Sequence, residues 1–240
     1  MNKLIRQFVK ICAETLPISE PIYEFGSLQG EQGSFSDLRP FFPGKKYIGA
    51  DMQDGLGVDV VLNLHDIDLP SNHSGTVLCL NTLEHVEFVR KAIEEIYRIL
   101  KPNGILVISS HMNFPIHGAP DDYWRFTPHG FKSLLKPFAS SFVEFCGDHI
   151  NPPFVIGIGF KGLISENIID KLMIKINHWK IYGGRLSKRW KKLLLNLIPP
   201  AFIPISLKIY KKIRGAYCEY CGITLKKNDE FCVECGRSQI

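Results

Sequence analysis

The apolar residues of the first 160 positions fall into two repeating patterns. Short apolar runs, typical of buried strands, occupy residues 21–25, 47–50, 59–64, 76–82 and 104–110. After the fourth run the spacing changes to three and four, which predicts an amphipathic helix over Val86, Val89, Ile93, Ile96, Tyr97 and Leu100. Lys101-Pro102-Asn103-Gly104 is typical of a helix end. Strands that alternate with helices predict an α/β fold with a doubly wound, mostly parallel sheet.

The same patterns continue on both sides of this region. One face of a predicted N-terminal helix is formed by Leu4, Ile5, Phe8, Val9, Ile11 and Cys12. Thr127 and Pro128 are typical of a helix start, with threonine at the N-cap and proline at the first helical position. Residues 142–148 and 153–160 are predicted to be two further strands. No apolar run is long enough for a clear membrane-spanning helix, and no signal peptide is expected.

The first predicted strand leads into the segment Glu24-Phe-Gly26-Ser-Leu28-Gln-Gly30. A helix-length segment follows, then a second strand that ends in Asp51. A strand, a small-residue turn, a helix and a strand tipped by a carboxylate form the nucleotide-binding half of a doubly wound sheet. Asp51 is suited to a ribose diol, because an ionised acid accepts hydrogen bonds from both hydroxyls. The spacing is not GxGxxG, so a dinucleotide enzyme is poorly supported; an ordinary strand-to-helix turn is the simpler alternative.

An acid two residues before the first glycine resembles motif I of the class I S-adenosylmethionine-dependent methyltransferases, with Leu28 in place of the usual middle glycine. LEHV and EEIYRILKPNGILVIS look like the fourth strand, helix and fifth strand of the same family. HGAPDDYWRFTP is similar to a string in type 11-like methyltransferases of bacterial glycan and cell-envelope gene clusters. The resemblance covers residues 22–138.

The resemblance implies a Rossmann-like, seven-stranded methyltransferase sheet whose last strand is antiparallel, in a domain spanning residues 1–162. S-adenosylmethionine is the implied cofactor, with Glu24 at the methionine ammonium, Asp51 at the ribose, and Asn63 and Leu64 at the adenine. The complete set of predicted cofactor-binding residues is Glu24, Gly26, Gly30, Asp51, Met52, Asn63, Leu64 and Asn81.

The predicted catalytic residues are His85, His117 and Asp121, with Asp122 behind them. A histidine near its ordinary pKa suits removal of a proton from a hydroxyl acceptor. Alternatively, His85 orients its loop and His117 caps one. A further alternative is that Glu84 and His85 together hold a divalent ion, as such a pair does in some O-methyltransferases of the resembled family. Tyr123, Trp124 and Arg125 either shape the acceptor pocket or pack the loop on the sheet, and packing is favoured for Trp124.

Positive charge is concentrated in one segment. Residues 151–217 hold 13 Lys and Arg but 2 acids, whereas residues 1–150 hold 13 and 18. We predict a basic and apolar helical extension over residues 163–215. Its part from 185 to 214 has basic flanks around an apolar centre, which suits contact with an anionic membrane surface. The alternatives are a helical hairpin packed on the domain and a nucleic-acid patch, and nucleic acid is the less favoured partner.

The last residues, 216–240, carry two CxxC pairs, Cys218 with Cys221 and Cys232 with Cys235, each followed by glycine. Four thiolates from two such turns suit one tetrahedral Zn²⁺, and the segment looks like a zinc ribbon that binds a protein partner. A disulfide or redox pair is the alternative. The remaining cysteines lie in apolar patterns and are predicted to be unpaired core residues: Cys12, Cys79 and Cys146.

These features predict an S-adenosylmethionine-dependent methyltransferase that modifies a hydroxyl of a small molecule or glycan. One alternative is a non-catalytic scaffold with the same fold, which Leu28 leaves open. The other is an RNA or protein methyltransferase recruited through the ribbon. We expect a cytoplasmic protein, peripheral at the inner membrane face if residues 185–214 bind lipid.

Overall fold

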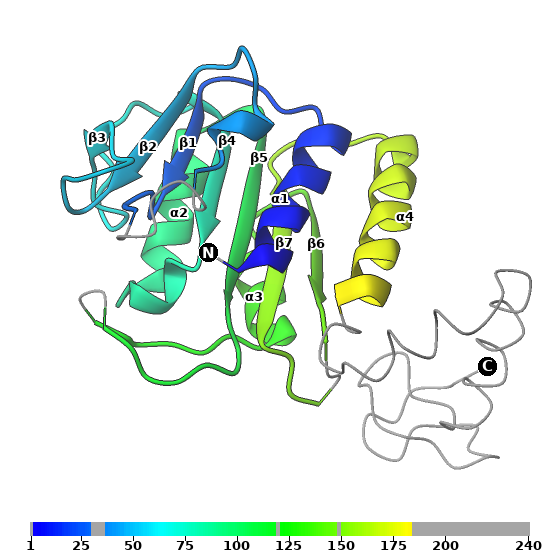
Figure 1. The fold of residues 1–240 in the computed structure, drawn as a ribbon. Coiled ribbons are helices and arrows are strands. Elements are labelled where there is room, and N and C mark those ends of the chain that lie inside the picture. Colours follow the sequence, from blue (N-terminus) through cyan, green and yellow to red (C-terminus); the bar gives the residue numbers. More distant parts are fainter. Residues whose placement is uncertain (1, 30–36, 119–120, 148–149, 184–240) are drawn as a thin grey trace, which may run out of the picture. The chain divides into compact units, whose positions relative to one another are not determined.

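The computed structural model describes residues 2–29, 37–118, 121–147 and 150–183 (Figure 1). The chain divides into two units, one of Met1–Gly147 with Pro152–Gly183 and one of Asp148–Asn151 with Gly184–Ile240. The second unit lies almost entirely outside the described residues, so the fold below is that of the first unit. Three predictions fall outside them: the glycine at position 30, the zinc ribbon and the membrane segment 185–214.

A single seven-stranded sheet forms the centre of this unit. Its strands are β1 (Ile22–Phe25), β2 (Tyr47–Asp51), β3 (Val60–Val61), β4 (Ser74–Leu80), β5 (Leu100–His111), β6 (Ser140–Phe145) and β7 (Phe154–Phe160). The order across the sheet is β3-β2-β1-β4-β5-β7-β6. β7 runs antiparallel to both of its neighbours, and every other pairing is parallel. The predicted Rossmann-like sheet with an antiparallel last strand is therefore confirmed.

Helices cover both faces of the sheet (Figure 1). They are α1 (Lys3–Thr15), α2 (Val89–Ile99), α3 (Pro128–Leu134) and α4 (Glu166–Gly183), with 3-10 turns η2 (Arg39–Phe41) and η3 (Leu83–His85). Because side chains alternate across a strand, β4 sends Val77 and Cys79 into the core under α2 and α3. Leu78 and Leu80 point into the other core, under α1 and α4. Burial on both faces explains the uninterrupted apolar run of β4.

Several local predictions are confirmed. In α1, the buried residues Ile5, Phe8, Val9 and Cys12 lie on the predicted face. Thr127 caps α3 by accepting a hydrogen bond from the Gly130 amide at 3.0 Å. The three cysteines of the apolar patterns are buried and free, and burial raises the pKa of the Cys146 thiol to about 11. No described helix is long and apolar enough to cross a membrane.

Other local predictions differ from the structure where it describes them. Residues 30–36 of the predicted helix between β1 and β2 lie outside the described residues, and residues 37–46 contain the 3-10 turn η2 and no α-helix. The predicted third buried strand is a two-residue edge strand in which Val61 is exposed. β5 starts at Leu100, before the predicted helix-ending Lys101–Gly104, because its first residue pairs with Ser74 across an irregularity in the ladder. In these segments the pattern of apolar side chains therefore predicted the element bounds and burial less well than in the central strands.

The helix α4 lies beyond the predicted domain boundary at residue 162 and packs against α1 within the same unit. Trp179 is buried beside Phe8, with ring centroids 5.9 Å apart, and its indole N–H donates to the Leu4 carbonyl at 2.9 Å. Part of the segment assigned to a separate extension is thus built into the core of the sheet domain.

We expect Trp179→Ala to lower the free energy of unfolding by about 3–5 kcal/mol, since it leaves a large cavity and an unpaired carbonyl. Ile174→Ala, on the exposed side of the same helix, should change it by less than about 0.5 kcal/mol. Urea unfolding followed by circular dichroism measures both. Equal, small effects would mean that α4 is not part of the cooperative unit.

Candidate functional site

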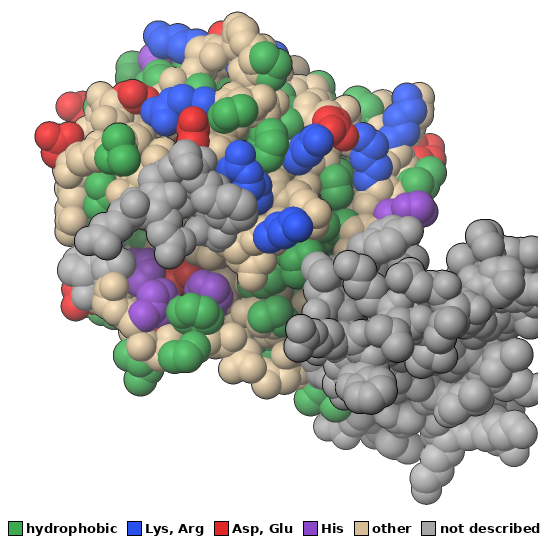
Figure 2. Space-filling model, viewed as in Figure 1, with side chains coloured by type: hydrophobic (Ala, Val, Ile, Leu, Met, Phe, Trp, Pro, Cys, Tyr) green, Lys and Arg blue, Asp and Glu red, His purple; other side chains and the backbone are tan. Residues whose placement is uncertain are grey.

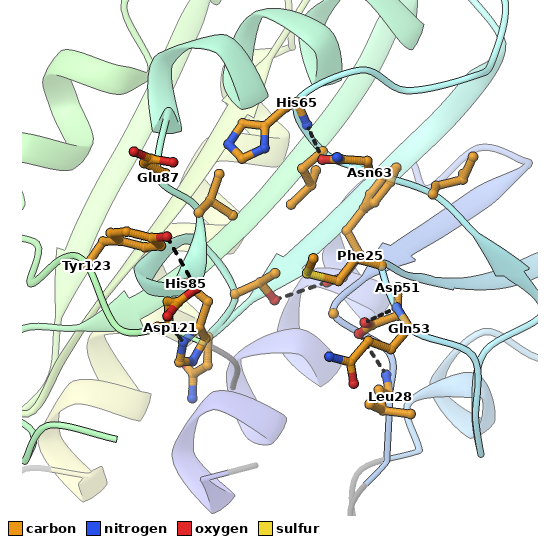
Figure 3. Close-up of a pocket in the computed structure, with 17 residues that line it drawn as sticks. Phe25, Leu28, Asp51, Gln53, Asn63, His65, His85, Glu87, Asp121 and Tyr123 are labelled. Atoms are coloured by element: carbon orange, nitrogen blue, oxygen red, sulfur yellow. Dashed lines mark hydrogen bonds between the residues drawn. The ribbon is translucent and has the colours of Figure 1, made fainter. Parts of the chain in front are cut away.

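A cavity of about 390 Å³ opens at the carboxyl ends of β1, β2 and β4 (Figure 3). Open α/β sheets bind their ligands at this edge, because loops that leave the strands can surround a ligand there. The cavity is lined by Phe25, Gly26, Leu28, Asp51, Met52, Gln53, Leu62, Asn63, Leu64, His65, Asn81, Thr82, His85, Val86, Glu87, Asp121 and Tyr123. Its volume suits a nucleoside-sized ligand.

Asp51 ends β2 on one side of the cavity. Its Oδ2 accepts a hydrogen bond from the Leu28 amide at 3.2 Å, and its Oδ1 accepts one from the Gln53 amide at 3.1 Å. Each carboxylate oxygen keeps a second lone pair for a ligand. Asp51 therefore orders two loops and still presents acceptors to the cavity, as a ribose-binding acid requires.

The backbone turns sharply where β1 and β4 end. Gly26 has a φ of +82°, and a Cβ there would lie 2.0 Å from Oγ1 of Thr82. Asn81 also has a positive φ, of 52°, and its Oδ1 accepts from the Ser109 hydroxyl at 3.1 Å. Glycine and asparagine are the residues that tolerate this left-handed conformation best. Strained backbone at two adjacent strand ends is typical of a functional site.

The upper part of the cavity combines apolar side chains with one amide. Leu62 and Leu64 are buried, whereas Met52 is 56% exposed. The Oδ1 of Asn63 accepts from the His65 amide at 2.9 Å, so the predicted adenine acceptor already holds its own loop. An exposed methionine beside an apolar wall is the kind of surface that a flat aromatic base covers.

Glu24 does not line the cavity, although it was predicted to contact the cofactor. Its side chain points to the α1 face of the sheet, where its Oε2 accepts from the Tyr47 hydroxyl at 2.7 Å. Burial raises the pKa of Glu24 to about 7, and the Tyr47 hydrogen bond opposes that rise. The structure therefore places this carboxyl group behind the strand end rather than on the wall of the cavity.

His85, Asp121 and Tyr123 form the wall opposite Asp51 (Figure 3). Nδ1 of His85 lies 2.5 Å from the backbone oxygen of Asp121, and the Tyr123 hydroxyl donates to Oδ2 of Asp121 at 3.3 Å. A carbonyl oxygen only accepts, so Nδ1 of His85 carries the proton and Nε2 of the neutral ring has a free lone pair. Two of the three predicted catalytic residues thus meet in the cavity.

His117, the third, does not line the cavity but lies directly behind His85, with ring centroids 4.8 Å apart. Its amide donates to Oδ2 of Asp122 at 2.8 Å. Arg125 clamps the same carboxylate through two hydrogen bonds of 2.5 and 2.7 Å, and these bonds hold the pKa of Asp122 well below its usual range. Asp122 and Arg125 therefore shape the loop, and the indole N–H of Trp124 packs it by donating to Val86 O at 2.9 Å.

Several lining residues were not predicted: Phe25, Gln53, Leu62, His65, Thr82, Val86 and Glu87. Most belong to the loops after β3 and β4. Thr82 directly follows Asn81 in the predicted strand-end segment, so its position could have been inferred from the strand. Phe25, Gln53, Leu62, His65 and Val86 adjoin predicted residues in the chain in the same way, and the tertiary fold brings their separate loops around one cavity.

Residues 45–108 match a family described as a methyltransferase domain. This match runs from β2 into β5 and includes Asp51, Asn81 and His85. No curated protein matches the chain. The match covers 64 of the 240 residues, and together with the fold it supports the predicted enzyme class, a methyltransferase.

Solved structures share the fold at low sequence identity. A chain of the Haloferax volcanii complex between the Trm112 methyltransferase activator and a protein assigned as a methyltransferase is 14% identical, with a TM-score of 0.50 over 66% of this chain and 90% of that one. The Burkholderia thailandensis 1,6-didemethyltoxoflavin-N1-methyltransferase, solved with 1,6-didemethyltoxoflavin and S-adenosylhomocysteine, is 16% identical, with a TM-score of 0.51 over 67% and 79%.

An Archaeoglobus fulgidus S-adenosylmethionine-dependent methyltransferase is 16% identical, with a TM-score of 0.50 over 65% and 94%. At these identities the likeness establishes the fold alone. Of these three, only the Burkholderia enzyme is described with an acceptor, so they do not identify the acceptor of this chain.

The raised pKa of Glu24 should make stability depend on pH. Between its ordinary value of 4.5 and about 7 the folded chain holds a proton that the unfolded chain has released. The protonated Glu24 carboxyl group therefore contributes fully to the free energy of unfolding below pH 4.5. This contribution is lost as pH rises through 7, in total about 3 kcal/mol. Glu24→Gln keeps an acceptor for Tyr47 but cannot titrate.

We expect the difference in unfolding free energy between Glu24→Gln and the wild type to grow in favour of the variant by about 2–3 kcal/mol between pH 5 and 8. Denaturant unfolding at a series of pH values measures it. Glu94→Gln, at an exposed site, is the control and should follow the wild type. A pH-independent difference for Glu24→Gln would show that this carboxyl group is ionised in the folded chain.

Proposed function

We propose that this methyltransferase transfers the methyl group of S-adenosylmethionine to a hydroxyl of a small-molecule or glycan acceptor. The observation that carries the proposal is the division of one cavity into two walls. Asp51 stands on the first wall, and His85 with Asp121 stands on the second. A nucleoside-binding acid and a group that takes a proton are the two requirements of O-methyl transfer.

The residues at the first wall fit the cofactor. Gly26 keeps the turn after β1 free of a side chain, and Asp51 offers its two remaining acceptor positions to the ribose hydroxyls. Met52, Leu62 and Leu64 provide an apolar slot for the adenine ring. When bound, S-adenosylmethionine supplies an electrophilic methyl group.

The residues at the second wall act on the acceptor. Tyr123 is 44% exposed and lines the cavity, so its ring is available to an acceptor. The lone pair on Nε2 of His85 and the carboxylate of Asp121 are two proton-accepting groups on this wall. Either can take the proton as the oxygen becomes nucleophilic.

The proposal also retains the sequence-based expectations for the rest of the chain. Its tail binds Zn²⁺ through Cys218, Cys221, Cys232 and Cys235 and offers a surface to a protein partner. The Haloferax neighbour, which was solved together with an activator protein, supports such a partner. A cytoplasmic location follows from the use of free thiols as zinc ligands.

Leu28 does not favour the scaffold alternative. Its side chain is 39% exposed at the cavity, and its amide, which a glycine would equally provide, donates to Asp51. Replacement of the usual glycine therefore leaves the backbone contact in place. Turnover is the direct test: labelled methyl groups should be transferred to lipid-linked sugars or small phenols but not to RNA.

We expect Asp51→Ala to weaken binding of S-adenosylmethionine by about 10- to 100-fold, since it removes charge-assisted hydrogen bonds of about 1.5–3 kcal/mol. Isothermal titration calorimetry measures the affinity. Asp54→Ala removes the same charge from an exposed position of the same loop and should leave affinity within about twofold. Equal affinities of the wild type and Asp51→Ala would contradict the assignment of the first wall.

A further inference from the structure

Behind the second wall lies a cluster of one carboxylate and three imidazoles. Glu84, His85 and His117 each place a potential metal-ligating atom within 4.8 Å of those of the other two. His111 adjoins them, with its Nε2 3.8 Å from Oε1 of Glu84. Figure 2 shows histidine side chains gathered on this face of the molecule around an acidic side chain. Glu84 and His85 come from η3, His111 ends β5, and His117 lies in the loop that follows β5. Hydrogen bonds from the Tyr123 and Trp124 amides to Glu84 O join this loop to η3.

The carboxylate of Glu84 has one oxygen without a partner. Glu84 is completely buried, and its Oε2 accepts from the Ser110 hydroxyl at 2.5 Å. Among the described residues, Oε1 has no hydrogen-bond partner, and neither has Nδ1 of His111. Leaving a buried neutral polar group without a hydrogen-bond partner lowers the stability of the fold by roughly 1–3 kcal/mol. The cost is larger for an ionised carboxylate oxygen, unless a cation or a proton satisfies it. The burial of Glu84 therefore requires an explanation.

Two histidines of the cluster, His85 and His117, have Nδ1 directed at hydrogen-bond acceptors. Nδ1 of His85 faces the Asp121 carbonyl, and Nδ1 of His117 lies 3.2 Å from both the Pro115 carbonyl and Oδ2 of Asp122. These neighbours only accept hydrogen bonds, so both Nδ1 atoms carry the proton. Each neutral ring therefore keeps its lone pair on Nε2. Metal-ligating histidines commonly donate their other N–H to a carbonyl or carboxylate in this way.

We propose that Glu84, His85 and His117 bind a divalent transition-metal ion beside the acceptor side of the cavity. Two imidazoles and one carboxylate favour Zn²⁺, Fe²⁺, Co²⁺ or Ni²⁺ over Mg²⁺ and Ca²⁺, which take oxygen ligands. Three protein ligands leave coordination positions open, which is the arrangement of catalytic rather than structural ions. His111, stacked on Phe114 with centroids 4.1 Å apart, closes the site on one side.

The role of this ion rests on the proposed function, although its binding does not. His85 lines the cavity, so an open position of the ion is accessible to an acceptor hydroxyl. A bound ion would supply Lewis-acid activation of an acceptor hydroxyl, and the Asp121 carboxylate would take the proton because the lone pair of His85 would then be used for the metal. The acceptor oxygen would form its bond to the methyl carbon as the carbon–sulfur bond breaks, with the electron pair of that bond remaining on sulfur.

The test is Co²⁺ binding to the full-length, metal-free protein, followed by absorption spectroscopy. The tail cysteines are a second expected site, and near-ultraviolet thiolate-to-cobalt bands report that site separately. We expect the wild type to show visible cobalt bands from the Glu84, His85 and His117 cluster in addition to the bands of the thiolate site. The bands of the cluster should persist when Cys218 and Cys221 are replaced by serine.

Two variants probe the cluster, and one serves as its control. Glu84→Gln keeps an acceptor for Ser110, and His117→Asn changes a residue of the loop; each should weaken cobalt binding at this site at least tenfold. His129→Asn makes the same substitution at an exposed histidine and should leave binding unchanged. Cobalt should also raise the melting temperature of the wild type more than that of His117→Asn.

A wild type without the non-thiolate spectrum at millimolar Co²⁺ would overturn the proposal, as would equal binding by the wild type and His117→Asn. Calorimetry with S-adenosylmethionine distinguishes this failure from a failure of the proposed function. Metal-free His117→Asn should bind S-adenosylmethionine within about twofold of the wild type, because His117 does not line the cavity. Loss of cobalt binding with unchanged cofactor binding therefore bears on the ion alone.

Discussion

The close contact between the turn after β1 and the end of β4 is the constraint on which the cavity depends. Gly26 lies so near Thr82 that no side chain fits between them, and Thr82 Oγ1 lies 3.2 Å from the Phe25 carbonyl, to which it donates. Asn81 then leaves β4 in a left-handed conformation. The segments that leave β1 and β4 diverge beyond this contact, and the space between them is part of the cavity.

Two buried glutamates lie near this edge of the sheet and have opposite surroundings. Glu24 faces the α1 side and is satisfied by the Tyr47 hydroxyl, so its burial is resolved within the core. Glu84 faces the loop after β5, and burial raises its pKa while one of its oxygens is left without a donor. The first acid supports the frame of the cavity, whereas the second has bonding capacity left for a ligand.

The loop between β5 and α3 acquires its shape from its own polar residues. Arg125 joins Asp122 to the carbonyl groups of Phe114 and Pro115, and the His111 carbonyl accepts from the Phe126 amide at 3.0 Å. These contacts bring His117 behind His85 although 32 positions separate them in the chain. The loop thus contributes to the site by positioning imidazoles, and most of its charged side chains are used for this purpose.

The sequence by itself determined the alternation of strands and helices, the capped start of α3 and the placement of Asp51, Asn81 and His85 at or just after strand ends. These features depend on local periodicity and on residues at element ends, where neighbours in the chain are also neighbours in space. The antiparallel last strand was implied by the family resemblance, and the order of the strands across the sheet came from the structure. Only the tertiary structure decided that Glu24 turns away from the cavity, that α4 packs on α1 and that His117 joins Glu84. The physical reason is that side-chain direction and contacts between distant loops depend on packing, which no local pattern of residues specifies.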